Sequence, residues 1–482
     1  MSILPMKYFW TFLVLIFGHQ SFGQQVYNLH EVEQQAAPPA GMGQLEEYLQ
    51  ANLQLPIALA AKGLNGRVFV QGIIEPDGSM SDLQVLRSIA PEVDKEVMRI
   101  LSLFRAWKPA MKGGSPVRQK LVYPAQIRTE ANPGYDAQEE VLLEYFNKKQ
   151  VATQIASEIE YRNYIPVDAL GHARGELLFQ KKKGDQWKTI VTVPFSGTET
   201  WIKLAGPKGA DSLQAIVTST KGSNANSVYE KVIRTPEGRI IAFELYEGNK
   251  SIPQVARYYY AHGGIRQSLQ LGESIGQKTD WYPNGQIRSI IQFEPESGKG
   301  PTILSNWAED GRPLVVNGEG SAILAGLPRE GAWVFDSGMV KDGKQEGLWS
   351  GRLADSTTIY EEEYIAGSLQ SGTDHLQNYT TYLQTEGSRP PQFKGGLMAM
   401  YQFMANSFYF PGTRPKGRVV TSFIVQPDGS IKDLKVLKGI GTEADKEALR
   451  VIGLMDGKWD PALYKGRSIA SPMSIPVNFQ AE

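Results

Sequence analysis

Residues 66–79 read GRVFVQGIIEPDGS and residues 417–430 read GRVVTSFIVQPDGS, at an offset of 351 residues (417 − 66). The same offset joins Asp94-Lys95-Glu96 to Asp445-Lys446-Glu447. Matches that share one register over this distance indicate an internal repeat. The two ends of the chain are therefore predicted to be copies of one domain.

Each copy shows the same order of elements. A short helix ends near a proline, which cannot continue it, and a β-branched strand follows. Pro-Asp-Gly then favours a tight turn, because Pro presets φ and Gly supplies a positive φ, and a second strand completes a β-hairpin. The predicted ranges are 45–53 and 397–404 for the helix, 68–74 and 419–425 for the first strand, and 83–86 and 434–437 for the second.

A second, amphipathic helix follows the hairpin in both copies. Its apolar residues fall at i, i+4, i+7, i+8 and i+11, a stripe that packs a helix onto a sheet. A closing strand is predicted at 117–127 and 469–479. The α-β-β-α-β order predicts α+β domains with two helices on a small, mainly antiparallel sheet. The stripe residues are Val93, Val97, Ile100, Leu101 and Phe104, and Ala444, Ala448, Val451, Ile452 and Met455.

The middle of the chain, residues 129–385, has a mostly β pattern. The heptapeptide YAHGGIR at 260–266 recurs as YPNGQIR at 282–288, 22 residues later. An aromatic strand, a Gly-containing turn and another strand predict hairpins at short spacing, clearest over 235–350. The pattern does not define a fold for 150–230. The aromatic residues of this region are predicted mainly to form cross-strand pairs, and the alternative is a platform that binds carbohydrate or peptide. These residues are Tyr258, Tyr259, Tyr260, Trp281 and Tyr282.

The N-terminus has the pattern of a secretory signal peptide at residues 1–23. Lys7 precedes an apolar run at 8–17, which at about ten residues is shorter than the ~20 that span a bilayer. Small residues, Ser21 and Gly23, precede a cut before Gln24. An uncleaved signal anchor is the alternative. We expect a soluble, exported periplasmic chain without a permanent membrane anchor.

Composition and motifs argue against several functions. The net charge of −1 gives no reason to expect nucleic acid as a partner. The chain has five scattered histidines and no cysteine, so metal-ligand spacing and thiol nucleophiles are lacking. No Gly-x-Ser-x-Gly elbow occurs. We expect no enzyme, no catalytic residues, and no cofactor or metal.

The terminal copies resemble the TonB C-terminal domain family, which implies domains at 36–128 and 388–482. The resemblance rests on Gly-x-Val with Pro-Asp-Gly, the Asp-Lys-Glu helix, a proline after the first helix, Trp-x-Pro, and a closing strand that contains proline. It implies a periplasmic domain that binds an extended peptide, the TonB box of outer-membrane receptors, along its last strand. The middle resembles the MORN-like repeats of bacterial proteins.

The candidate site follows from that resemblance. An unpaired strand edge offers backbone donors and acceptors to an extended segment, and by match the edges are Arg118, Lys120, Val122 and Tyr123, and Pro472, Ser474, Ile475 and Val477. For the repeated Asp77 and Asp428, Asp94-Lys95-Glu96, and Trp107 and Trp459, we favour structural roles in turns, helix ends and packing.

Two functions remain open. The first is a periplasmic peptide-binding adaptor that engages an outer-membrane TonB-dependent receptor or another envelope protein. The second is an envelope scaffold or assembly factor that uses the same fold without receptor engagement. A transducer of this family also has an inner-membrane helix and a Pro-rich spacer, neither of which this sequence shows, so transmission of force is not predicted.

Overall fold

The computed structural model of the chain divides into two compact units. The predicted signal peptide at 1–23 lies outside the described residues. Those residues are 25–206, 209–220, 228–247, 252–295, 297, 300–325, 333–375, 380–383, 389–409, 416–464 and 467–479.

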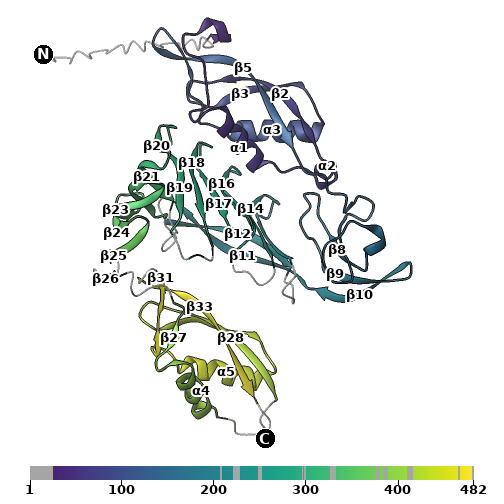
Figure 1. Ribbon diagram of the computed structural model, residues 1–482, viewed down its shortest axis with the longest axis vertical. Coiled ribbons are helices and arrows are strands. Elements are labelled where there is room, and N and C mark those ends of the chain that lie inside the picture. Colours follow the sequence, from purple (N-terminus) through teal and green to yellow (C-terminus); the bar gives the residue numbers. More distant parts are fainter. Residues whose placement is uncertain are drawn as a thin grey trace, which may run out of the picture. The chain divides into compact units, whose positions relative to one another are not determined.

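The N-terminal domain is a helix-on-sheet domain of the predicted α+β type. Its sheet has the order β1-β5-β2-β3, with β4 paired to β5, and α1 and α3 pack on one face of the sheet (Figure 1). The bounds are β1 Val26–Tyr27, η1 Leu29–Glu31, α1 Met42–Asn52, α2 Ile57–Ala60, β2 Asn65–Ile74, β3 Met80–Arg87, α3 Pro91–Leu103, β4 Ala110–Lys112 and β5 Ser115–Arg128.

The C-terminal domain repeats this plan with the sheet order β29-β28-β33. The helices α4 and α5 take the places of α1 and α3 (Figure 1). The bounds are β27 Gln392–Phe393, α4 Gly396–Ser407, β28 Gly417–Val425, β29 Ile431–Lys438, α5 Thr442–Gly453, β30 Trp459–Asp460, β31 Ala462–Tyr464, β32 Arg467–Ile469 and β33 Ser471–Phe479.

The predicted helical stripe forms the core of each domain. All ten of its residues are buried, five on or next to α3 and five on or next to α5. They pack against the alternating inward residues of the first strand, such as Val68 and Val70 on β2 and Val419 and Phe423 on β28. The helix periodicity therefore identified the buried face correctly in both copies.

Between the two domains in sequence, residues 135–193 form a five-stranded sheet with the order β10-β9-β8-β7-β6. The sequence left much of this region without a predicted fold. A short helix, η2 (Ala156–Glu158), precedes the third strand. The strands are β6 Tyr135–Asp136, β7 Val141–Phe146, β8 Tyr161–Pro166, β9 Leu177–Lys183 and β10 Gln186–Val193.

A 16-stranded sheet follows, in which every strand pairs with its neighbours in sequence, from β11 to β26. The predicted series of hairpins is thereby confirmed. The strands are β11 Phe195–Gly206, β12 Gly209–Thr220, β13 Val228–Arg234, β14 Ile240–Glu247, β15 Val255–Tyr259, β16 Ile265–Leu271, β17 Gly276–Trp281, β18 Ile287–Phe293, β19 Thr302–Trp307, β20 Pro313–Val316, β21 Glu319–Ala325, β22 Phe335–Lys341, β23 Lys344–Arg352, β24 Thr358–Ile365, β25 Ser368–Asp374 and β26 Thr380–Leu383.

The repeated tyrosines of this sheet make equivalent contacts. The Tyr260 hydroxyl donates to the Trp281 carbonyl oxygen at 2.7 Å, and the Tyr282 hydroxyl donates to the Trp307 carbonyl oxygen at 3.1 Å. Each turn is thus tied to the end of the strand that begins the next hairpin. The repeat seen in the sequence corresponds to a repeated structural contact.

Candidate functional site

The outer edge of β33 exposes backbone groups in a pattern set by two prolines. β33 pairs with β28 in one uninterrupted antiparallel register, with Pro472 opposite Ile424 and Pro476 opposite Val420. Because proline has no N–H, these two are the non-hydrogen-bonded pairs of the ladder. Pair types alternate, so Ser474 also directs its N–H and C=O away from β28. The outer edge over 472–476 therefore presents three carbonyl oxygens and one amide, that of Ser474.

The same argument defines the outer edge of β5. Pro124 lies opposite Phe69 on β2, so its partners two and four residues back, Val122 and Lys120, also direct their backbone groups outward. Gln126 continues this series, and its carbonyl oxygen accepts a hydrogen bond from Gln50 Nε2 of α1 at 2.6 Å. The Gln50 side chain on α1 thus satisfies the outward-facing carbonyl oxygen of Gln126 on β5.

The start of the β5 edge is covered by the chain's own N-terminal segment. β1 runs parallel to β5, with Val26 opposite Arg118 and Tyr27 opposite Gln119. The Lys112 ammonium lies 4.2 Å from the Tyr27 ring centroid, a cation–π contact. Slightly downstream, the Ala36 amide donates to Gln119 Oε1 at 2.6 Å. The segment from 26 to 36 is therefore held against the closing strand at several points.

The C-terminal domain keeps only part of this arrangement. The isolated bridge between Gln34 and Met111 has its counterpart in the bridge between Arg389 and Leu463. The residues that precede each domain's sheet are therefore related by an offset of 355 residues (389 − 34). By that offset the counterpart of β1 is residues 381–382, which belong to β26 and pair with β25. Ala405 is the counterpart of Gln50. Among the residues described, β33 has β28 as its single partner strand.

The opposite edges of the two sheets are irregular. The β2–β3 and β28–β29 ladders each contain two register shifts, whereas the β2–β5 and β28–β33 ladders contain none. Asp82 and Asp433 sit at these irregularities with φ of 48° and 53°. Bulges of this kind disrupt an edge and discourage pairing. The closing strands are the regular edges of these sheets.

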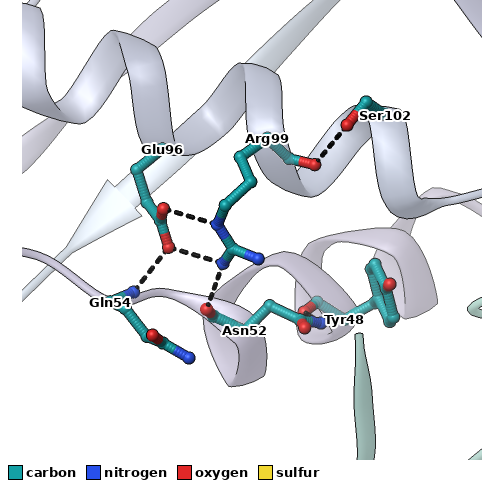
Figure 2. A network of polar contacts seen from close by, with 6 residues as sticks. All are labelled: Tyr48, Asn52, Gln54, Glu96, Arg99 and Ser102. Carbon is teal, nitrogen blue, oxygen red and sulfur yellow. Dashed lines mark hydrogen bonds and ion pairs between the residues drawn. The ribbon is translucent and has the colours of Figure 1, made fainter. Parts of the chain in front are cut away.

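A polar network fixes the end of the first helix against the second in both domains. Glu96 and Arg99 on α3 form a two-point ion pair at 2.7 Å, the Gln54 amide donates to Glu96 Oε1 at 2.8 Å, and Arg99 donates to the Asn52 carbonyl oxygen at 3.0 Å (Figure 2). The sequence predicted a role at a helix end for Glu96, but α3 begins at Pro91 and Glu96 lies in its second turn.

The C-terminal domain contains the same network. Glu447 and Arg450 form the ion pair at 2.7 Å, and the Tyr409 amide donates to Glu447 at 2.6 Å. Arg450 donates to the Ser407 carbonyl oxygen, so Ser407 is the counterpart of Asn52. Hydrogen bonding to Arg450 holds the pKa of Glu447 below its usual value and raises the pKa of Arg450. The repeated Glu-x-x-Arg spacing was the signal for this network.

The eight sequence-predicted site residues all lie on the closing strands. Lys120, Val122, Pro472 and Ser474 direct their backbone groups outward, and Arg118 belongs to the same alternating series. The other three contribute buried side chains, with exposed fractions of 3% for Tyr123, 2% for Ile475 and 1% for Val477. Their backbone groups face the neighbouring strand.

Arg118 is also tied to the turn region of its domain. Its guanidinium forms two hydrogen bonds to the Glu75 carboxylate, at 2.8 and 2.7 Å. This pairing lowers the pKa of Glu75 and raises the pKa of Arg118. The ion pair with Glu75 thus fixes the Arg118 side chain at the end of the β5 edge that β1 covers.

The structural roles predicted for Asp77, Asp428, Asp94, Trp107 and Trp459 are confirmed. Asp77 and Asp428 each accept a hydrogen bond from the hydroxyl of the serine two residues on at 2.6 Å and from its amide at 2.9 Å, which lowers the pKa of both carboxyls. Asp94 accepts the Ile89 amide at the start of its helix. Trp107 and Trp459 are 3% and 1% exposed.

The aromatic residues of the middle sheet mostly serve packing. Tyr259, Trp281 and Tyr282 are buried, and the Tyr258 hydroxyl donates to Glu244 at 3.0 Å. Within the described parts of the chain there is no cluster of three His, Asp or Glu side chains suited to a metal ion. No helix in those parts is long and apolar enough to cross a membrane.

Comparison with known proteins bears on the two terminal domains. Residues 51–126 and 413–481 match the family described as Gram-negative bacterial TonB protein C-terminal. These are the two copies inferred from the internal repeat, and each terminal domain is similar to this family. The middle region lies outside both matches. A search among curated proteins finds no match for the chain.

Proposed function

We propose that this chain is a periplasmic peptide-binding adaptor that engages an outer-membrane receptor or another envelope protein by β-strand addition. The observation that carries the proposal is the regular, outward-facing edge of β33, on a domain that matches the TonB C-terminal family. A strand edge binds any extended segment through backbone hydrogen bonds, and neighbouring side chains add selectivity. The role is binding, without catalysis or a cofactor.

The test removes one backbone donor without changing the rest of the edge. Val122 and Ser474 both direct their N–H outward, so Ser474→Pro and Val122→Pro each delete a donor that the sheet itself does not use. Ser474→Ala and Val122→Ala keep the donor and serve as matched controls. The ligand is a labelled peptide with the TonB box of an outer-membrane receptor, and the readout is fluorescence anisotropy.

The expected result is a loss of affinity of about tenfold or more for at least one proline variant, about 1.4 kcal/mol, with its alanine control near wild type. Circular dichroism confirms that each variant is folded. Equal losses from proline and alanine would indicate recognition by side chains instead. Unchanged binding in both proline variants would contradict strand addition.

One observation favours the second candidate, an envelope scaffold that does not engage receptors. β1 already covers the start of the β5 edge, so one of the two closing strands has a partner from its own chain. In that case neither edge would bind a receptor peptide in the anisotropy experiment, and all proline variants would behave as wild type.

A further inference from the structure

The two closing strands differ in what lies along their outer edges. In the N-terminal domain, β1 covers the start of the β5 edge and Gln50 occupies the Gln126 carbonyl near its end. In the C-terminal domain, the counterpart of β1 pairs with β25, and Ala405 stands where Gln50 would be. These are two separate differences, one on a strand and one on a helix, and both leave the β33 edge more open.

We infer that, of the two closing strands in the described part of the chain, β33 is the open strand-addition edge, because the chain's own β1 occupies the start of the equivalent edge in the N-terminal domain. The inference rests on the proposed function and states which of the two copies binds. It makes the adaptor monovalent, although its sequence contains two copies of the binding domain.

The pairing of β1 with β5 also indicates what the β33 edge can hold. β1 is a short extended segment, and its register places Val26 and Tyr27 opposite Arg118 and Gln119. The residues at the matching positions of the second copy, 352 further on, are Ala470, which directly precedes β33, and Ser471, the first residue of β33. An extended segment of another protein would add to β33 as β1 adds to β5.

The chemistry of the edge restricts its occupant. Over 472–476 the edge supplies three carbonyl oxygens but only the Ser474 amide, since Pro472 and Pro476 have no N–H. The partner strand must therefore supply most of the donors, as a proline-free extended peptide does. A second copy of β33 fits poorly, because antiparallel pairing centred on Ser474 would set Pro472 of one chain against Pro476 of the other.

The first arm of the test needs no ligand. Hydrogen exchange is measured by mass spectrometry on the full chain and on a variant that lacks residues 25–28. We expect the segment 117–121, through its outward-facing amides of Arg118 and Lys120, to exchange at least tenfold faster in the deletion variant, while the outward-facing amide of Ser474 stays fast in both. Tyr27→Ala, which removes the ring over Lys112 but keeps the strand, gives a smaller change in the same direction. Unchanged exchange at 117–121 would overturn the inference.

The second arm counts binding sites with a labelled peptide that copies residues 24–30, QQVYNLH, the segment that carries β1. We expect one equivalent bound by the full chain, none by Ser474→Pro, and two by the deletion variant. Adding Val122→Pro to the deletion variant should return it to one. Two equivalents on the full chain, or binding that survives Ser474→Pro, would overturn the inference.

The two arms separate the inference from the proposed function. Failure of every variant to bind a peptide would contradict strand addition, while the exchange arm would still decide whether β1 covers β5. Analytical ultracentrifugation completes the test. A dimer that Ser474→Pro dissociates would show that a second copy occupies β33, and would overturn the inference.

Discussion

The two terminal domains share a fold, a polar network and a buried tryptophan, yet their closing strands have different neighbours. The N-terminal domain uses residues 26–27 to extend its own sheet, whereas the corresponding residues of the C-terminal domain extend the sheet of the middle region. The difference arises upstream of the domain and not within it. In a duplicated domain, the segment that precedes each copy can thus decide whether a binding edge is available.

Equivalent mutations in features that the two domains share should destabilise both domains. A difference between the two losses in free energy then reports a difference in local packing. Gly429 and Gly78 have φ of +83° and +81° at the Pro-Asp-Gly turn. A Cβ at Gly429 would lie 2.4 Å from the Trp459 carbonyl oxygen, and a Cβ at Gly78 would lie 2.7 Å from that of Trp107. Both turns are closed down onto the tryptophan backbone.

The largest expected effect is therefore that of Gly429→Ala, about 3 kcal/mol in the opening free energy of its domain, followed by Gly78→Ala at about 2 kcal/mol. Gly457→Ala and Gly113→Ala are the matched controls, since both have positive φ but no atom within 4 Å of the added Cβ, and about 1 kcal/mol is expected. Native-state hydrogen exchange at α5 and α3 measures each effect in the full chain. Equal losses for turn and control glycines would show that the clash with the tryptophan carbonyl is relieved elsewhere.

The next effect concerns the helix-tethering network and depends on pH. Hydrogen bonding to Arg450 lowers the pKa of Glu447 from its ordinary 4.5, so the ion pair contributes stability above pH 4.5 that is lost as the pH falls through the lowered pKa. Because Arg450 is 44% exposed, we expect Glu447→Gln to lower the opening free energy of α5 by only about 1 kcal/mol at pH 7.

That difference should shrink as the pH falls through the lowered pKa of Glu447, because the wild-type carboxyl then becomes protonated as well. Hydrogen exchange at α5, followed across pH 3–7, measures it. Glu96→Gln is the counterpart in the N-terminal domain, and we expect a similar or larger loss in α3 at pH 7, because Arg99 is less exposed at 35%. A Glu447→Gln loss that does not change as the pH is lowered would assign the effect to packing and not to charge.

The sequence predicted those parts of the molecule that depend on local pattern. The stripe ending at Phe104 follows from helical spacing, and the turn at Gly78 follows from Pro-Asp-Gly, because in each case the residues involved are close in sequence. The covering of β5 could not be predicted in this way. Val26 and Arg118 are 92 residues apart (118 − 26), and a two-residue strand has no periodicity to detect.

The polar network and the outward-facing residues of the closing strand could be predicted only in part. Glu-x-x-Arg occurs at 96–99 and again at 447–450, so its repetition was visible, but its target, the backbone at the end of the first helix, required the fold. For the closing strand, the prolines indicated which residues face outward once the pairing with β28 was known. Without that register, the inward residues Ile475 and Val477 could not be separated from the edge.

The smallest expected effect tests the second difference between the domains, the side chain that closes the end of the β5 edge. Gln50→Ala removes the hydrogen bond from Nε2 to the Gln126 carbonyl oxygen. Water can replace that bond at a partly exposed edge, so we expect a loss of only about 0.5 kcal/mol in the opening free energy of β5. The reverse change, Ala405→Gln, offers the same donor to the carbonyl of Asn478, two residues after Pro476, and should stabilise β33 by a similar amount. Hydrogen exchange in β5 and β33 measures both, with Gln44→Ala on α1 as a control that leaves the edge unchanged. A Gln50→Ala loss of 2 kcal/mol or more would show that the helix, and not β1, is the main cover of the N-terminal edge.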